Sequence, residues 1–326
     1  MAADNDLAAY ARADLDEISK VIYGQNQVDL KVEVHLPSQS FRELHADDHS
    51  SSEEIMPMTS AKDQLASFLD WAFDKSKENI LILWGHGQGP RLSNSTSSFG
   101  GIFTGSENYT PLSTETLATI ISDRSIDLLI FDMCLMQNII TLEHLKNKAP
   151  IVIGSAQIQN FIGLPYDKVI NEMRKNISLE NLSKEIVKIT AQIMPNKNYT
   201  FSAFYNGKNQ NILLALETLN KEILDLFLQD PYYEFIFSTY FIDLPSFPGN
   251  YIDLGMYIGI LKKIDYENKI FSKKLRKKIQ KVQDEINFSL IEKRYGSEYI
   301  EGNRPYFVEF FQGLSVPKRK LIIPKL

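Results

Sequence analysis

The chain has 326 residues, of which 44% are apolar and 23% are charged, and its mean hydropathy is −0.20. This composition excludes wholesale disorder and fibrous proteins, and the length suits one large domain or two moderate ones. The net charge of −6 argues against a dedicated binder of nucleic acid or of anionic membranes. No apolar run reaches the roughly 18 residues of a membrane span. The single cysteine, Cys134, excludes an intrachain disulfide and leaves open whether its thiol is core filler or a nucleophile.

The first half of the chain alternates helical and strand patterns. Apolar residues spaced by three or four indicate helices, and short apolar runs such as ILILW and DLLIF are typical of parallel strands covered on both faces. The opening MAADNDLAAY has the pattern of the end of a strand that leads into a helix. Residues 37–56, rich in Ser, His and acidic side chains, predict an irregular excursion. We predict helices at residues 6–21, 60–73, 113–122 and 135–146, and strands at residues 28–36, 79–84, 127–132 and 150–156.

This alternation predicts the fold class. Helices and strands that follow one another in this way are typical of an α/β/α sandwich with a mostly parallel central sheet. Beyond residue 166 the pattern becomes less regular, so we expect a catalytic core over residues 1–170 and a C-terminal α+β extension over residues 171–326. Within the extension we predict helices at residues 181–194, 211–228 and 272–295, and strands at residues 199–205 and 306–314.

Two of the buried strands end next to reactive side chains. His86 lies two residues after ILILW. Cys134 lies two residues after Asp132, the residue that follows DLLIF. The carboxyl ends of neighbouring parallel strands meet at one edge of a sheet, so we expect the imidazole and the thiol to lie together. Nucleophilic catalysis requires this pairing, because the thiolate is the reactive form. A cysteine after a buried strand is by itself more often a small residue of the hydrophobic core, but the paired histidine favours a catalytic role.

Local features around the pair support this interpretation. We predict that Cys134 opens the helix at residues 135–146, where unpaired backbone N–H groups favour a thiolate. Gly87 carries no side chain, so its N–H and that of Cys134 are candidates for an oxyanion hole. Gly85 and Gly89 allow the tight turn that presents His86.

The segments ILILWGHGQG and DLLIFDMCLM resemble the histidine and cysteine blocks of the clostripain family of cysteine peptidases, which are relatives of caspases, gingipains and legumains. The segments MAADNDL, SSFGGIF, GLPYDKVI and GLSVP resemble further blocks of the family. The resemblance implies a caspase-like fold and an endopeptidase that cleaves peptide or protein substrates without a cofactor. It implies His86 as general acid and base, Cys134 as nucleophile, and an oxyanion hole made by Gly87 and Cys134.

The resemblance also implies a pocket for the residue that precedes the cleaved bond. In the family the acidic residue in the place of Asp132 lines this pocket, and members typically prefer Arg or Lys; Asp132 is equally a candidate helix cap for the turn at Cys134. Members commonly carry an acidic residue just before the glycine of the block that matches GLPYD, where this chain has Phe161 and Ile162. We therefore expect a more apolar pocket. A Glu that often follows the cysteine is replaced by Ile140.

No metal site with a defined ligand pattern is present in the sequence. His45 and His49 have the spacing of a helical metal site, but the Glu of HExxH is absent and the segment is Ser-rich, so a solvated loop is favoured. Some members of the family respond to calcium, and four carboxylates are weak candidates for such a site: Asp47, Asp48, Glu53 and Glu54.

Two function hypotheses follow. The first is a cysteine endopeptidase, and the alternative is a catalytically silent or regulatory protein that binds a peptide in the same fold. The presence of both His86 and Cys134 favours the first.

The basic run at residues 273–281 shares its helix with an apolar stripe and is interpreted as a solvated face rather than a nucleic-acid surface. Many members of the family are exported and self-processed, so we expect an extracytoplasmic bacterial enzyme, with no prediction for a lost leader, a processing site or an oligomeric state.

Overall fold

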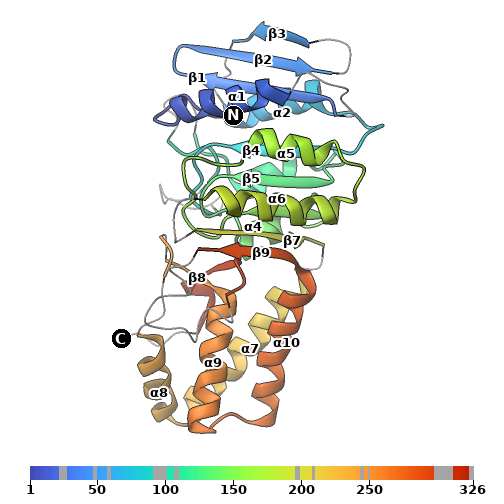
Figure 1. Cartoon of the computed structure of the whole chain (residues 1–326). Helices are drawn as coiled ribbons and strands as arrows, with labels where there is room; N and C mark the ends of the chain where they lie inside the picture. The colour runs from blue at the N-terminus through green and yellow to red at the C-terminus, as the bar shows by residue number, and fades with distance from the viewer. Residues whose placement is uncertain are drawn as a thin grey trace.

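The structure, a computed structural model, describes residues 1–21, 28–46, 50–56, 60–90, 101–105, 110–194, 199–207, 210–242, 246–248, 250–296 and 311–322. Five strands form its central sheet in the order β4-β5-β6-β7-β9 (Figure 1). These are β4 (Ile80–Trp84), β5 (Leu128–Asp132), β6 (Ile151–Gly154), β7 (Thr200–Tyr205) and β9 (Leu290–Tyr295). Pairing is parallel from β4 to β6 and antiparallel from β6 to β9. The α/β class is confirmed, but the sheet is mixed, because the second half of the chain supplies two antiparallel strands.

A second, antiparallel sheet lies beyond β4 and consists of β1 (Leu30–Leu36), β2 (Gln39–His45) and β3 (Ser50–Glu54). The irregular excursion expected at residues 37–56 is therefore wrong in its described part. β3 is exposed along its whole length, so it forms through backbone pairing with β2 and has no apolar pattern that the sequence could reveal. Residues 1–3 lie between the two sheets, where the Ala2 N–H donates to the Trp84 carbonyl (3.0 Å) and the Ala3 N–H donates to the His35 carbonyl (2.9 Å).

Helices cover both faces of the sheet, as Figure 1 shows for α1, α5 and α6 on the nearer face. One face packs against α1 (Ala8–Val21), α5 (Tyr166–Met173) and α6 (Leu179–Ile193), and the other packs against α2 (Ala61–Ala72), α3 (Thr114–Ile120) and α4 (Ile139–His144). Side-chain caps fix where several helices begin. Ser60 accepts the Asp63 N–H, and Ser113 and Ser178 cap α3 and α6 in the same way.

The C-terminal part forms a helical layer next to β9 (Figure 1). It contains α7 (Gln210–Gln229), α8 (Pro231–Phe241), β8 (Tyr251–Asp253), α9 (Leu254–Asn268), α10 (Lys273–Ser289), β10 (Ser315–Pro317) and the 3₁₀ helix η2 (Lys318–Lys320). The helix predicted at residues 272–295 is too long, because α10 ends at Ser289 and the chain continues as β9. The strand predicted at residues 306–314 lies mostly outside the described residues.

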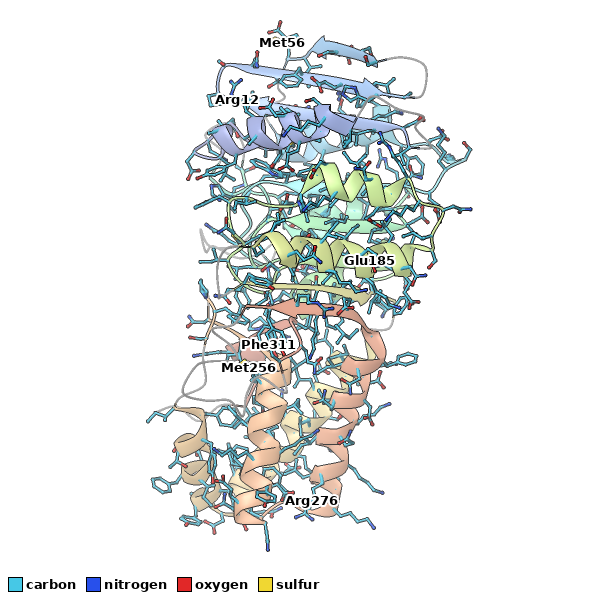
Figure 2. All side chains as sticks on the ribbon, viewed as in Figure 1. Arg12, Met56, Glu185, Met256, Arg276 and Phe311 are labelled. Carbon is cyan, nitrogen blue, oxygen red and sulfur yellow. The ribbon has the colours of Figure 1, made fainter. Side chains whose placement is uncertain are left out.

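The helical layer shares its core with the sheet. Figure 2 shows Met256 and Phe311 in the interior and Arg276 at the surface of α10, and Phe311 packs against Tyr295 of β9 with ring centroids 5.2 Å apart. The apolar stripe of α10 is buried, so the interpretation of its basic residues as a solvated face is confirmed. The domain boundary at residue 170 stays a prediction; it falls within α5.

Candidate active site

The two strands that precede His86 and Cys134 are neighbours. β4 and β5 pair in parallel with Trp84 opposite Asp132, and the Gly85 N–H lies 3.4 Å from the Asp132 carbonyl oxygen. His86 and Cys134 each follow this register pair by two residues, so both leave the sheet at the same edge. The predicted adjacency of the two strand ends is thus present in the structure.

Gly87 brings the two loops into direct contact. A Cβ atom on Gly87 would lie 2.5 Å from the Cys134 carbonyl oxygen and 3.0 Å from the Met133 Cγ. The first distance is shorter than any contact that Cβ atoms normally make in proteins. Only glycine permits this approach of the histidine loop to the cysteine loop. Among the described residues, neither the Gly87 N–H nor the Cys134 N–H donates a hydrogen bond to another residue.

The His86 ring is held from the side of the N-terminal segment. Its Nε2 lies 2.7 Å from Oδ1 of Asp6, and the Thr104 N–H donates to the His86 carbonyl (3.2 Å). A carboxylate only accepts hydrogen bonds, so this contact places the proton of a neutral ring on Nε2 and leaves the lone pair on Nδ1. His86 and Cys134 form no direct hydrogen bond within the described part of the chain. Sequence reasoning missed Asp6, although it lies in the MAADNDL block.

Cys134 does not open a helix, so that prediction is wrong. Leu135 adopts a left-handed conformation (φ 64°), and α4 begins only at Ile139, after Asn138 as its cap. Gln159 contacts the thiol instead: its N–H donates to Sγ at 3.3 Å, and its carbonyl oxygen lies 3.9 Å from Sγ. Burial raises the pKa of the Cys134 thiol, the charge of Asp132 adds to this effect, and the Gln159 N–H offsets part of it. This environment favours the thiol over the thiolate.

Asp132 is buried beneath this loop and does not cap a helix, which excludes one of its two predicted roles. Its Oδ1 accepts a hydrogen bond from the Gln159 side chain, and its Oδ2 accepts from the Leu164 N–H (3.2 Å) and the Tyr166 hydroxyl (3.0 Å). Burial raises the pKa of Asp132 to about 6, although these donors act in the opposite direction. Gly163 (φ 65°) is required here, because a Cβ would lie 2.9 Å from Oδ2.

The same loop presents an apolar surface and an unsatisfied acceptor. Phe161 and Ile162 are 54% and 44% exposed, and the Phe161 ring stacks on Tyr10 at 5.2 Å. The Gln159 Oε1 atom is buried and finds no hydrogen-bond donor in the described residues. Gln159 therefore contacts both Cys134 and Asp132 and retains one free acceptor, a role that no sequence motif indicated.

Comparison with known proteins identifies the family. The model of the clostripain family matches residues 1–305. The chain belongs to the clostripain family. It is accordingly a cysteine peptidase, a hydrolase of peptide bonds, and the resemblance stated from the sequence is confirmed.

Solved structures of clostripain-family (C11) proteases share the fold. A secreted C11 cysteine protease from Bacteroides thetaiotaomicron, solved with an irreversible peptide inhibitor, has a TM-score of 0.69 and 17% identity over 97% of this chain and 90% of that chain. An inactive zymogen C11 protease from Parabacteroides distasonis has a TM-score of 0.69 and 19% identity over 98% of this chain and 91% of that chain. No curated protein matches the chain.

The clostripain-like chain shows no clustered metal ligands in its described residues. Of the four carboxylates considered for calcium, Asp47 and Asp48 lie outside these residues, and Glu53 and Glu54 lie on β3. His45 lies on β2 with its Nε2 3.1 Å from Glu43, and His49 is not described. Of the helices that the structure describes, none combines the length and hydropathy of a transmembrane segment.

A second buried carboxyl group lies next to the catalytic strands. Asp14 of α1 accepts a hydrogen bond from the Trp84 Nε1 (2.7 Å), and burial, with the charge of Asp132, raises its pKa from 3.8 to about 8. The folded protein therefore keeps a proton that the unfolded chain releases between these two pH values. The free energy of unfolding is expected to fall as the pH rises from about 4 to about 8.

Asp14→Asn tests this cost of ionisation, because an amide oxygen still accepts from Trp84 but carries no charge. We expect the free energy of unfolding at pH 8 to rise by about 1 kcal/mol or more relative to wild type, with a smaller difference at pH 4. Urea unfolding at the two pH values measures the effect. Asp16→Asn, at an exposed position of the same helix, is the matched control and should change neither value appreciably. Equal pH dependence in wild type and Asp14→Asn would contradict the assignment.

Proposed function

We propose that this peptidase is an endopeptidase in which Cys134 is the nucleophile and His86 the general acid and base. The observation that carries the proposal is the convergence of the two loops at one sheet edge, with Gly87 packed against the Cys134 carbonyl. Membership of the clostripain family supports it independently.

The arrangement suggests how each proton moves. The raised pKa of Cys134 favours the protonated thiol before substrate binds. The proton therefore passes to His86 Nδ1 at the same time as Sγ attacks the substrate carbonyl carbon. The oxyanion accepts hydrogen bonds from the Gly87 and Cys134 N–H groups, and Asp6 stabilises the imidazolium. The amine leaves with the proton of His86. Water then attacks the thioester with His86 as base, the C–S bond breaks, and the proton passes from His86 to the Cys134 sulfur, so that no cofactor is consumed.

We further propose that the residue before the cleaved bond is Arg or Lys. Asp132 supplies a negative charge above about pH 6, and the free Oε1 of Gln159 supplies a neutral acceptor beside it. Phe161 and Ile162 are apolar and partly exposed, which suits the methylene stem of a long basic side chain. The apolar residues at these two positions would thus contact the stem, and the buried carboxylate would select the charge.

A peptide pair that differs only in charge tests this specificity. One fluorogenic peptide carries Lys before the cleaved bond, and the other carries its uncharged analogue norleucine. At pH 7.5 we expect kcat/KM to be about 10-fold or more higher for the Lys peptide, which corresponds to the free energy of a hydrogen bond to a charged group. Because Asp132 is protonated below about pH 6, the ratio should fall towards 1 at pH 5.

Asp132→Asn is the matched control, since it keeps the shape of the side chain and removes its charge. The variant should show no rise in the Lys-to-norleucine ratio between pH 5 and pH 7.5. A wild-type preference for norleucine at both pH values would refute the basic specificity while leaving the peptidase proposal intact. Absence of hydrolysis of any peptide in a full panel would refute the catalytic roles of His86 and Cys134.

We propose that the protein is exported and cleaves its substrates outside the cytoplasm. A relative of the same fold is described as a secreted protease, which supports export of this chain. Detection of the protein in the culture supernatant or periplasm of its source bacterium, rather than in the cytosol, tests this placement.

A further inference from the structure

A two-stranded ribbon from the C-terminal part of the chain contacts both loops of the candidate active site. It consists of β8 (Tyr251–Asp253) and β10 (Ser315–Pro317), which pair antiparallel with Ser315 opposite Asp253. All of its residues are buried, and β8 lies where the helical layer meets the central sheet (Figure 1). Neither strand has a role in the proposed mechanism.

Ser315 of the ribbon binds the loop that carries Cys134. Its N–H donates to the Gln137 carbonyl (3.0 Å), and its hydroxyl donates to the same oxygen (3.2 Å). The hydroxyl also accepts a hydrogen bond from the Asn138 side-chain amide (2.9 Å). Asn138 is the cap of α4, where its Oδ1 accepts the Ile140 N–H (2.9 Å). Ser315 therefore holds the cysteine loop at the point where the loop ends and the helix begins.

Tyr251, on the other strand of the ribbon, contacts the histidine loop. A Cβ at Gly89 (φ 78°) would lie 2.7 Å from the Tyr251 hydroxyl oxygen and 2.9 Å from its Cζ, so this loop packs directly on the phenol ring. Gly89 follows His86 by three residues, as Gln137 follows Cys134. One ribbon thus lies against both loops just beyond the two candidate catalytic side chains.

A buried carboxylate fixes the position of Ser315. Asp253 is fully buried, and its two oxygens accept the N–H groups of residues 312–314, which precede Ser315, at 2.8–3.2 Å. The same carboxylate caps α9 through the Met256 N–H (3.1 Å). Because a buried carboxylate is stable only when donors surround it, these contacts anchor the turn before β10 to the start of α9.

Two segments hold the backbone of the cysteine loop. One is the segment after β6, where carbonyls of residues 155–157 accept the N–H groups of Leu135 (3.0 Å) and Gln137 (2.9 Å). The other is β10, through Ser315. Since Cys134 lies outside a helix and Leu135 is left-handed, the conformation of this loop depends on such contacts rather than on helical hydrogen bonds.

We propose that Ser315 is a positioning residue of the peptidase: by binding Gln137 and Asn138, it sets the conformation of the loop that carries the nucleophile. The inference rests on the proposed role of Cys134. Ser315 acts through the backbone of this loop, so it affects the geometry of attack rather than the binding of substrate. Its removal should lower kcat and leave KM largely unchanged, because a displacement of the nucleophile by about 1 Å slows the chemical step.

Ser315→Ala and Val316→Ala form a matched pair that separates positioning from stability. Both shorten a fully buried side chain of β10 and should lower the Tm, but neighbouring side chains of a strand point to opposite faces, and it is the Ser315 hydroxyl that binds the cysteine loop. With a fluorogenic peptide we expect kcat to fall about tenfold or more in Ser315→Ala, with KM within about twofold of wild type. In Val316→Ala, kcat should stay within about twofold of wild type. Wild-type kcat in Ser315→Ala, or an equal fall in both variants, would overturn the proposal.

Hydrogen exchange gives a readout that is independent of catalysis. The amides of Leu135 and Gln137 should exchange about tenfold or more faster in Ser315→Ala than in Val316→Ala, because the first variant releases the cysteine loop. Equal exchange of these amides in the two variants would contradict the positioning role even if activity falls. A wild type that hydrolyses no peptide would instead refute the proposed function, and the exchange rates would still decide whether Ser315 orders the loop.

Asn138→Ser removes the same contact from its other partner and keeps a side-chain oxygen that can cap α4. It should show the same fall in kcat as Ser315→Ala, and it replaces that variant if Ser315→Ala does not fold. In the double variant the fall in kcat should be smaller than the product of the two single falls, because both substitutions delete one shared hydrogen bond. Falls that multiply would show that the two residues act separately, against the proposal.

Discussion

Cys134→Ala is expected to reduce kcat/KM for peptide hydrolysis by at least about 10⁴-fold, to the background of the assay. The physical reason is that no other thiol exists in the chain, so no alternative nucleophile of this class can attack the carbonyl. The fold should survive, because Cys134 is only partly buried and its replacement removes one sulfur atom next to Gln159. Steady-state kinetics with a fluorogenic peptide and circular dichroism measure the two effects.

The matched variant is His86→Ala, which retains the thiol and removes the base. It should lose activity to a similar extent, while a thiol-specific alkylating reagent still labels Cys134 once per chain. Hydrolysis that persists in Cys134→Ala would refute the nucleophile assignment. Full activity in His86→Ala would refute the dyad but not the nucleophile.

Gly87→Ala is expected to reduce kcat/KM by about 100-fold or more and to destabilise the fold by about 1–3 kcal/mol. The added Cβ would lie 2.5 Å from the Cys134 carbonyl oxygen, and a backbone atom cannot rotate away from it. The histidine and cysteine loops must therefore move apart, which displaces both catalytic side chains and both candidate oxyanion N–H groups. Kinetics and thermal unfolding measure the two losses.

Gly207→Ala is the matched control for this substitution. A Cβ at Gly207 would meet its nearest atom, Asn147 Oδ1, only at 3.9 Å, which is ordinary van der Waals contact. We therefore expect wild-type activity and stability from Gly207→Ala. Wild-type activity in Gly87→Ala would show that the loops tolerate separation, and it would argue against an oxyanion hole formed by Gly87 and Cys134.

The parallel centre of the fold could be predicted from the sequence because its signals are local. The runs ILILW and DLLIF are apolar throughout, since both faces of these strands are covered, and the caps of α2 and α3 depend on single residues, Ser60 and Ser113. Strands held mainly by backbone pairing were missed. β3 exposes its serines and glutamates, and β9 continues directly from α10 without a break in the sequence pattern.

The surroundings of the candidate nucleophile could not be predicted in the same way. The pattern after Cys134 favours a helix over residues 135–146, but the left-handed Leu135 and pairing with residues 155–157 delay α4 to Ile139. Gln159, which contacts both Cys134 and Asp132, is 25 residues beyond the cysteine, and it reaches the site only because β6 lies next to β5.

The sequence by itself determined the family, the parallel strands and the two residues proposed for catalysis, because each depends on side-chain types at short, fixed spacings. Only the tertiary structure decided which groups set their chemistry: Asp6 on the imidazole, the Gln159 N–H on the thiol, and the buried donors around Asp132. These partners come from distant parts of the chain, and burial, which exists only in the folded protein, raises the pKa values of Cys134 and Asp132.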